Sequence, residues 1–179
     1  MLYTDSYGSP LGKLLLFGDE QGLTALRFAD GARVGAPETQ RAAVLRETEL
    51  FEQTKRWLEL YFSGRDPGFL PKVHWTGSAF RRRVGELLCE IPFGETVSYG
   101  QIAARIAKER GLERMSAQAV GGAVGKNPIC ILVPCHRVVG ANGGLTGYAG
   151  GIWRKKALLE LEGNDMSRFT LPKVQKISE

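Results

Sequence analysis

A run of glycine and proline residues, GRDPGFLPK at residues 64–72, divides the chain into two parts with different sequence patterns. Glycine and proline in quick succession interrupt both helices and strands. Before this run, apolar segments alternate with turn signals, and after it apolar residues recur at helical spacing. We therefore place a boundary between Ser63 and Gly77, with a mixed strand-and-helix unit before it and a helical unit after it.

The first unit begins with apolar segments that are short enough to be strands. LYTDSY, KLLLF and LTALRF are separated by the turn-forming segments GSPLG and GDEQG, which predicts three short antiparallel strands. From Arg41 to Phe62 the apolar residues fall near helical spacing, and Gly64 provides a stop. The first unit therefore reads as a small sheet with one helix.

Helical signals dominate the second unit. Residues 78–91 carry apolar side chains on one helical face, and the segment PFGE follows them. Ser98 can cap a second helix over residues 99–111, and Ser116 can cap a third over residues 117–125. This order is typical of a helix-turn-helix core, although it also fits other small helical bundles.

The third helix, AQAVGGAVG, consists almost entirely of small residues. Gly121 and Gly122 inside it should each cost roughly 1 kcal/mol relative to alanine. Glycine at these positions is useful where another backbone approaches closely. That backbone is either a neighbouring helix or a phosphodiester chain, and the sequence pattern leaves both open.

The positive charge of the chain is concentrated in its second part. Residues 1–75 hold nine basic and ten acidic side chains, whereas residues 76–179 hold 15 basic and nine acidic ones. A basic region beside a neutral one is typical of a polyanion-binding protein, but also of an ordinary basic surface.

We expect a cytoplasmic protein, nucleoid-associated if bacterial, because the N-terminus lacks a signal peptide and no apolar run could span a membrane.

The stretch ILVPCHRVVG places Cys135 beside His136 in a chain with three cysteines and two histidines. We expect ICILV to form a buried strand that Pro134 ends. A nearby imidazole can take the proton of a thiol, but neighbours in an extended segment point to opposite sides. A reactive Cys135 and an inert core Cys135 therefore both remain open.

The odd number of cysteines does not predict a disulfide framework. Cys89 and Cys130 are predicted to be core residues.

These motifs together resemble a known family. PCHRVVG, preceded by AVGGAVGKNPI and followed by LTGYAGG and LLELEG, is similar to the O6-alkylguanine-DNA alkyltransferases over Ala79 to Gly163. The resemblance implies an α+β fold: an N-terminal ribonuclease-H-like domain with a small antiparallel sheet and helix, then a helical, winged-helix-like domain with a helix-turn-helix. The expected domains are residues 1–75 and 76–163, followed by a polar tail at 164–179.

The resemblance implies direct-reversal DNA repair. The alkyl group of O6-alkylguanine in duplex DNA would pass irreversibly to Cys135, once per chain, after the base is rotated out of the stack. His136 would draw off the thiol proton through a water, and Glu162 would orient His136. Tyr99 matches a tyrosine that protonates the departing guanine, and Asn127 matches an asparagine that holds the adjacent turn. O4-alkylthymine is a second candidate substrate.

The same resemblance assigns residues to the base pocket and to DNA. Pocket residues are Val138, whose carbonyl would meet the guanine amino group, and Tyr148, Ala149 and Gly150. The expected DNA contacts are the third-helix residues Ser116, Gln118, Ala119 and Gly122. Arg81 and Arg82, at the start of the first helix of the basic part, are further candidates for phosphate contacts, or else form a solvated face.

This sequence departs from the family pattern at two of these positions. Gln118 stands where many relatives carry the arginine that fills the space of the flipped base, so we expect weaker DNA binding or slower flipping. Ala149 replaces a serine found in some relatives. The zinc ligands of certain animal relatives have no counterpart, and we expect no metal and no cofactor.

We expect the protein to act as a monomer on double-stranded DNA and not on membranes. An alternative function is that of an alkyltransferase-like protein that binds the lesion without transfer, although such relatives lack a cysteine at the position of Cys135. A cysteine hydrolase would instead show repeated turnover.

Overall fold

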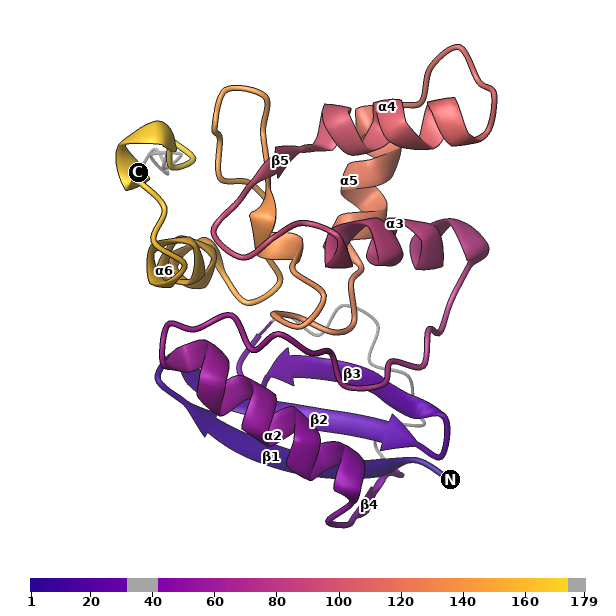
Figure 1. Ribbon diagram of the computed structural model, residues 1–179, viewed down its shortest axis with the longest axis vertical. Coiled ribbons are helices and arrows are strands. Elements are labelled where there is room, and N and C mark those ends of the chain that lie inside the picture. The colour runs from indigo at the N-terminus through magenta and orange to yellow at the C-terminus, as the bar shows by residue number, and fades with distance from the viewer. Residues whose placement is uncertain (32–41, 174–179) are drawn as a thin grey trace, which may run out of the picture.

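The computed structural model describes residues 1–31 and 42–173. A sheet with one helix forms its lower part in Figure 1, and the helical part with the C-terminal segments lies above it. This arrangement confirms the expected α+β fold with an N-terminal sheet and a C-terminal helical unit. No helix within these two ranges has the length and apolar character needed to cross a bilayer.

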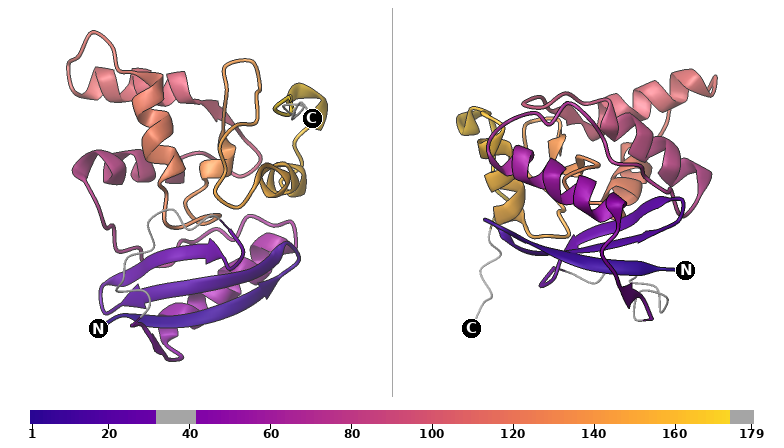
Figure 2. Two further views of the ribbon diagram at one scale, coloured as in Figure 1. Left: turned by 180° about the vertical axis from the view of Figure 1, so that it is seen from behind. Right: turned by 60° about the horizontal axis from the view of Figure 1, so that its bottom comes forward.

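Antiparallel pairing joins the first three strands into a sheet. The strands are β1 (Tyr3–Ser9), β2 (Gly12–Asp19) and β3 (Gly22–Phe28), as the alternating segments predict. A short fourth strand, β4 (Val44–Leu45), runs parallel to β1 and gives the order β3-β2-β1-β4. Helix α2 (Glu49–Phe62) lies across one face of this sheet (Figure 2). The buried face of α2 is centred on Leu58, which is fully buried.

Helix α2 begins later than its sequence pattern suggests. The predicted start at Arg41 lies outside the described residues, and Val44 and Leu45 are in a strand and not in a helix. The helix starts after Thr48, whose Oγ1 accepts a hydrogen bond from the backbone N–H of Phe51 at 3.2 Å. An N-cap threonine satisfies an otherwise unpaired N–H and so sets the first turn. Apolar spacing alone does not show where such a cap acts.

The helix-turn-helix unit is formed by three capped helices. They are α3 (Ala79–Cys89), α4 (Tyr99–Glu109) and α5 (Ala117–Gly125), with Ser78, Ser98 and Ser116 as their N-caps. Helix α5 packs against both α3 and α4. Strand β5 (Val97–Ser98), directly before α4, pairs in parallel with β6 (Val138–Val139). The helix-turn-helix reading of the sequence is therefore confirmed.

The segment ICILV is buried, but it is not the strand that its apolar residues predict. It makes an isolated bridge from Ile129 to Leu26 and then turns, with Ile131 at a φ of 67°. The Asn127 side chain closes this turn: its amide nitrogen donates to the carbonyls of Ile129 and Val133 at 3.1 and 2.9 Å, and its oxygen accepts from the Ile129 N–H. An amide side chain here satisfies backbone groups that a strand ladder would otherwise pair.

The free edge of β3 joins the two parts of the chain. Leu23 on this edge exchanges backbone hydrogen bonds with the segment at Lys72 and His74, and Leu26 does so with Pro128 and Cys130. Buried apolar side chains from the sheet, α2, the helix-turn-helix and the C-terminal helix form one continuous core. The sheet therefore supports the segment that leads directly to Cys135.

The C-terminal segments complete the upper part. They are the 3₁₀ turn η1 (Cys135–Arg137), helix α6 (Ile152–Leu161) and the 3₁₀ turn η2 (Met166–Arg168). After η2, Thr170 bridges the loop that follows β6 at Gly144. Residues 174–179 of the expected polar tail lie outside the described residues.

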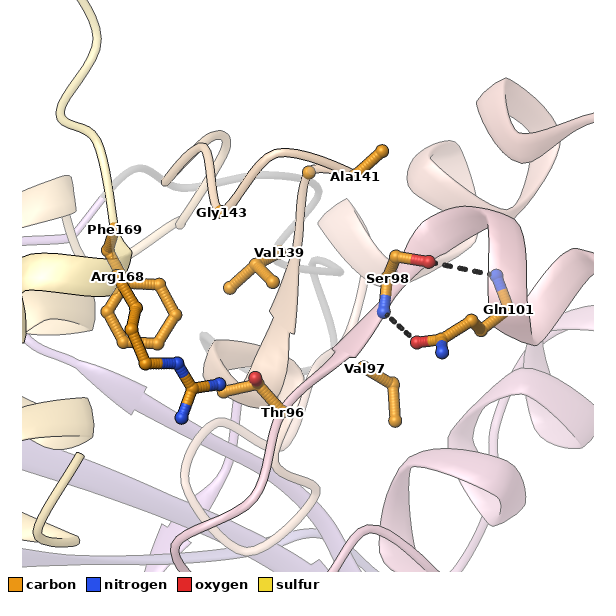
Figure 3. A pocket seen from close by; sticks show the side chains of 10 residues that line it. Thr96, Val97, Ser98, Gln101, Val139, Ala141, Gly143, Arg168 and Phe169 are labelled. Atoms are coloured by element: carbon orange, nitrogen blue, oxygen red, sulfur yellow. Dashed lines mark hydrogen bonds between the residues drawn. The ribbon is translucent and has the colours of Figure 1, made fainter. Parts of the chain in front are cut away.

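An open pocket of about 210 Å³ lies where β5, the loop after β6 and η2 meet (Figure 3). Ser98 and Gln101 on its wall form a reciprocal capping box at the start of α4. Phe169 and Arg168 line the opposite side. This pocket does not include Cys135.

We expect Thr48→Ala to destabilise the protein, because it removes the hydroxyl that starts α2. The free energy of unfolding, measured by urea denaturation, should fall by about 1 kcal/mol. Thr48→Ser keeps the hydroxyl and should stay close to the unchanged protein. Equal stability of the alanine and serine variants would contradict a role of this cap.

Candidate active site

Cys135 lies at the start of η1, where the turn after Asn127 ends. Its backbone N–H donates to the carbonyl of Val133 at 2.8 Å, and its side chain is almost enclosed, with 8% of the residue exposed. His136, the next residue, is fully buried. The 3₁₀ turn thus removes the objection that adjacent residues in an extended segment face opposite sides, because this segment is not extended.

Glu162, at the C-terminal end of α6, is the centre of a buried polar cluster. His136 Nε2 lies 2.8 Å from Glu162 Oε1, and Arg137 directs Nε and Nη2 to the same carboxylate at 2.9 to 3.1 Å. The Gly94 N–H donates to Oε2 at 3.2 Å. The Tyr61 hydroxyl, on α2, donates to Oε1 at 2.8 Å. The carboxylate therefore accepts hydrogen bonds from four residues.

The contact with Glu162 defines the tautomer of His136. An ionised carboxylate only accepts hydrogen bonds, so Nε2 carries the proton and donates it. Nδ1 then has a free lone pair, and it is buried without a hydrogen-bond partner among the described residues. This nitrogen is thereby available as a base on the residue next to Cys135.

Opposing effects determine the pKa values of this pair. Burial alone would raise the pKa of Glu162, but the hydrogen bonds and charges of His136 and Arg137 outweigh it and lower the pKa to about 2. Burial lowers the pKa of His136 below its ordinary 6.5, and the carboxylate only partly opposes this. At neutral pH the cluster therefore holds a charged Glu162 and a neutral His136.

The Cys135 thiol needs a base to ionise. Burial raises its pKa above the ordinary value of 9.0, whereas the Asn127 side chain and the positive charge of Lys155 act in the opposite direction. Burial also raises the pKa of the Cys130 thiol, and raises that of Cys89 to about 11. Cys135 differs from the other two in the Asn127 amide, which favours its thiolate, and in having a histidine as the next residue.

Lys155 is a fully buried cation on α6. Its Nζ donates to the carbonyl of Val138 at 2.7 Å and to that of Thr146 at 2.9 Å. Burial lowers its pKa to about 8, while the nearby thiol group acts to raise it. The Val138 carbonyl, expected to meet the guanine amino group, thus already accepts a hydrogen bond from a buried lysine.

The other pocket residues, Tyr148, Ala149 and Gly150, lie in the loop from Thr146 to Gly151. The Tyr99 hydroxyl donates to the Thr146 carbonyl at 3.4 Å. The Tyr148 hydroxyl is buried near the Cys130 thiol, and Ala149 is exposed. A Cβ at Gly150 would lie 2.9 Å from the rings of both Phe28 and Tyr148, so glycine permits their close approach.

The exposed face of helix α5 consists mainly of small residues. Val120, Ala123 and Val124 are buried, whereas Ser116, Gln118, Ala119 and Gly122 are exposed. A Cβ at Gly122 would meet nothing within 4 Å, so close helix packing does not explain this glycine. Gln118 is the one long side chain among these four exposed residues.

Of the two candidate phosphate contacts on α3, Arg82 already has a partner. Arg82 Nε pairs with Glu86 Oε1 at 2.9 Å, and Arg83 bridges Glu86 and Glu109. Arg81 and Arg82 are both exposed, at the opposite end of α3 from its C-cap. Exposed ion pairs of this kind are weak and can be exchanged for a phosphate.

Three buried polar residues of the site were missed by the sequence reasoning. Arg137 directly follows the Cys-His pair within PCHRV, so its position could have indicated a role. Tyr61 and Lys155 had no such signal, because a tyrosine at apolar helical spacing reads as core and a lysine in a helix reads as surface. In residues 1–31 and 42–173 no group of three or more His, Cys, Asp or Glu side chains is arranged to hold a metal ion.

Both parts of the chain match known families and relatives. Residues 2–69 match the family "6-O-methylguanine DNA methyltransferase, ribonuclease-like domain", and residues 79–164 match "6-O-methylguanine DNA methyltransferase, DNA binding domain". The methylated-DNA–protein-cysteine methyltransferase of Methanosarcina acetivorans is 42% identical over 91% of this chain and 99% of its own length. The Mycobacterium leprae protein of the same name is 41% identical over 90% and 93%, respectively.

Solved structures give the same result. The Mycobacterium tuberculosis O6-methylguanine methyltransferase is 40% identical, with a TM-score of 0.77 and coverage of 95% of this chain and 96% of that chain. The same organism's OGT in complex with DNA is 41% identical, with a TM-score of 0.75 over 93% and 94%. The fold, the ordered motifs and these relatives lead to one conclusion: the chain belongs to the 6-O-methylguanine DNA methyltransferase family.

Proposed function

We propose that this protein repairs DNA by direct reversal, transferring the alkyl group of O6-alkylguanine to Cys135. The observation that carries this assignment is the hydrogen bond from His136 Nε2 to Glu162 Oε1 at 2.8 Å, which leaves Nδ1 free as a base on the residue that follows the nearly enclosed Cys135. Two features support it further: membership of the family and the names of relatives that cover almost the whole chain.

The proposed reaction is one displacement. A water carries the Cys135 proton to His136 Nδ1, and the sulfur then attacks the alkyl carbon. A carbon–sulfur bond forms as the bond between that carbon and guanine O6 breaks. The Tyr99 hydroxyl supplies a proton to the departing guanine, which is a poor leaving group as an anion. The thioether that remains has no route back to a thiol, so each chain reacts once.

Glu162 supports this step through charge. The transferred proton makes His136 an imidazolium in a buried site, where an unpaired charge is costly. The adjacent carboxylate compensates that charge at the moment it forms. The Cys135 thiolate is stabilised by a hydrogen bond from the Asn127 amide and by the positive charge of Lys155.

Base flipping is part of the proposal, because a thiol enclosed to this degree cannot reach a base inside a duplex. The exposed face of α5 would enter the minor groove, and Gln118 would occupy the space of the extruded base. The loop around Tyr148 would close over that base, with O4-alkylthymine as a second candidate substrate. The protein would act as a monomer without cofactor.

The alternative is a protein that binds the lesion without transferring the alkyl group. The polar cluster around Glu162 argues against it, because lesion binding alone does not require a histidine that follows a cysteine and whose Nδ1 is free to act as a base. Alkyl transfer separates the two functions directly.

We expect intact-protein mass spectrometry to show a single methyl adduct per chain after incubation with an O6-methylguanine duplex. Cys135→Ser should abolish the adduct, because it replaces the attacking sulfur. Cys89→Ser, in α3, should react like the unchanged protein. Tight lesion binding without an adduct would favour the lesion-binding alternative.

Glu162→Gln should change how stability depends on pH. The folded-state pKa of Glu162, about 2, lies below its ordinary 4.5, so its ionised form stabilises the fold above pH 4.5, and this stabilisation is lost as the pH falls toward 2. Between about pH 5 and about pH 2, the variant should therefore lose less unfolding free energy than the unchanged protein, by on the order of 3 kcal/mol.

The control for this measurement is Glu160→Gln, an exposed carboxylate on the same helix. It should keep the pH dependence of the unchanged protein in denaturant titrations at each pH. If the unfolding free energies of all three proteins changed with pH in parallel, the Glu162 carboxylate would not be held as an anion by the fold.

Gln118→Ala should slow transfer from a duplex by about tenfold, equivalent to about 1.4 kcal/mol. Transfer from free O6-methylguanine base should be unchanged, because no base pair has to open. Gln118→Arg should bind duplex more tightly. The slope of the logarithm of its binding constant against the logarithm of salt concentration should be steeper by about one, because one more counterion is released. Gln53→Ala, an exposed glutamine on α2, is the control. Equal slowing with duplex and free base would exclude a flipping role.

A further inference from the structure

Tyr61 is the contribution of the N-terminal part to the buried cluster. It lies near the end of α2, 101 positions before Glu162, and is fully buried. Its hydroxyl donates to Glu162 Oε1 at 2.8 Å and lies 3.3 Å from His136 Nε2. The hydroxyl therefore contacts both members of the pair that prepares the base.

The geometry allows one assignment of the protons. Nε2 already donates to Glu162, so it cannot accept a hydrogen bond from the Tyr61 hydroxyl, which must donate to the carboxylate. Oε1 thus receives the imidazole and phenol protons side by side. Any rotation of the carboxylate away from this position would weaken the contact that keeps Nδ1 unprotonated.

The ring of Tyr61 is itself held in place. It stacks on Trp57 with ring centroids 5.2 Å apart and planes at 8°, and it meets Phe93 edge-on at 5.9 Å. Packing on two sides leaves the phenol few alternative positions. Burial and the Glu162 charge both raise the pKa of Tyr61, so the hydroxyl remains a donor throughout the neutral range.

We propose that Tyr61 is a positioning residue for the alkyl transfer: its hydroxyl holds the Glu162 carboxylate in line with His136. The N-terminal part would then contribute to the reaction directly, in addition to supporting the fold. This inference rests on the function proposed above for Cys135, His136 and Glu162.

The test compares Tyr61→Phe with Thr54→Val in single-turnover transfer from an O6-methylguanine duplex. Tyr61→Phe keeps the ring and removes only the hydroxyl. Thr54→Val removes another fully buried hydroxyl of α2, which bonds the Leu50 carbonyl within the helix and does not contact the cluster. Tyr61→Phe should react about tenfold more slowly, and Thr54→Val at the unchanged rate. Duplex affinity should be unaffected in both.

The pH dependence of the rate gives a readout that loss of packing would not change. Without the Tyr61 hydroxyl the carboxylate is held less well against His136 and stabilises an imidazolium less, so the pKa of His136 falls further. The acid limb of the rate profile should shift down by about one pH unit in Tyr61→Phe, and not in Thr54→Val. The ionisable groups around His136 that contribute to this limb are Cys135 and Arg137 on η1, Lys155 and Glu162 on α6, and Tyr61 on α2.

A double-mutant cycle tests whether Tyr61 acts through Glu162. In a Glu162→Gln background, Tyr61→Phe should slow transfer by less than about twofold, because the group it positions is already altered. Additive effects on the rate, or an unchanged rate and acid limb in folded Tyr61→Phe, would overturn the inference. Absence of an adduct at Cys135 in the unchanged protein would instead contradict the proposed function, so the two failures are distinguishable.

Discussion

The buried carboxylate of Glu162 is the interaction on which the rest of the site depends. A lone charge in this position would be too costly to bury, and four residues from different parts of the chain satisfy it. One of them, His136, is thereby limited to a single tautomer. Arg137 adds a full positive charge, bridges to the Ile91 carbonyl at 2.6 Å, and so joins η1 to the end of α3. The same contacts that make the anion tolerable therefore also orient the base.

The β3 edge and helix α2 connect this cluster to the N-terminal sheet. Backbone pairing of Leu26 with Pro128 and Cys130 supports the turn that precedes Cys135, and Tyr61 contacts Glu162 from the opposite direction. A further connection comes from α6, where Arg154 donates to the Leu11 carbonyl and pairs with Asp30. The two parts of the chain thus share one core and surround one site.

Local patterns in the sequence predicted much of this fold. Alternation of apolar residues with turn signals identified β1, β2 and β3, and serine caps identified α4 and α5. The errors arose where side chains replaced backbone pairing: the Asn127 amide turns ICILV away from a strand, and Thr48 starts α2 after a short strand. Neither effect has a period that can be read along the chain. The site residues Cys135, His136 and Glu162 were identified only through the family resemblance, since their chemistry alone left an inert core cysteine open.

The sequence by itself determined the three strands at the N-terminus, the three capped helices of the second unit and the family, because these depend on short-range spacing and on motifs. Only the tertiary structure decided which groups meet. Tyr61 and Glu162 are 101 positions apart, and Lys155 reaches the carbonyls of Val138 and Thr146 from the interior of a helix. Contacts of this kind form when packing brings distant segments together, and nothing in the local pattern of either segment indicates its partner.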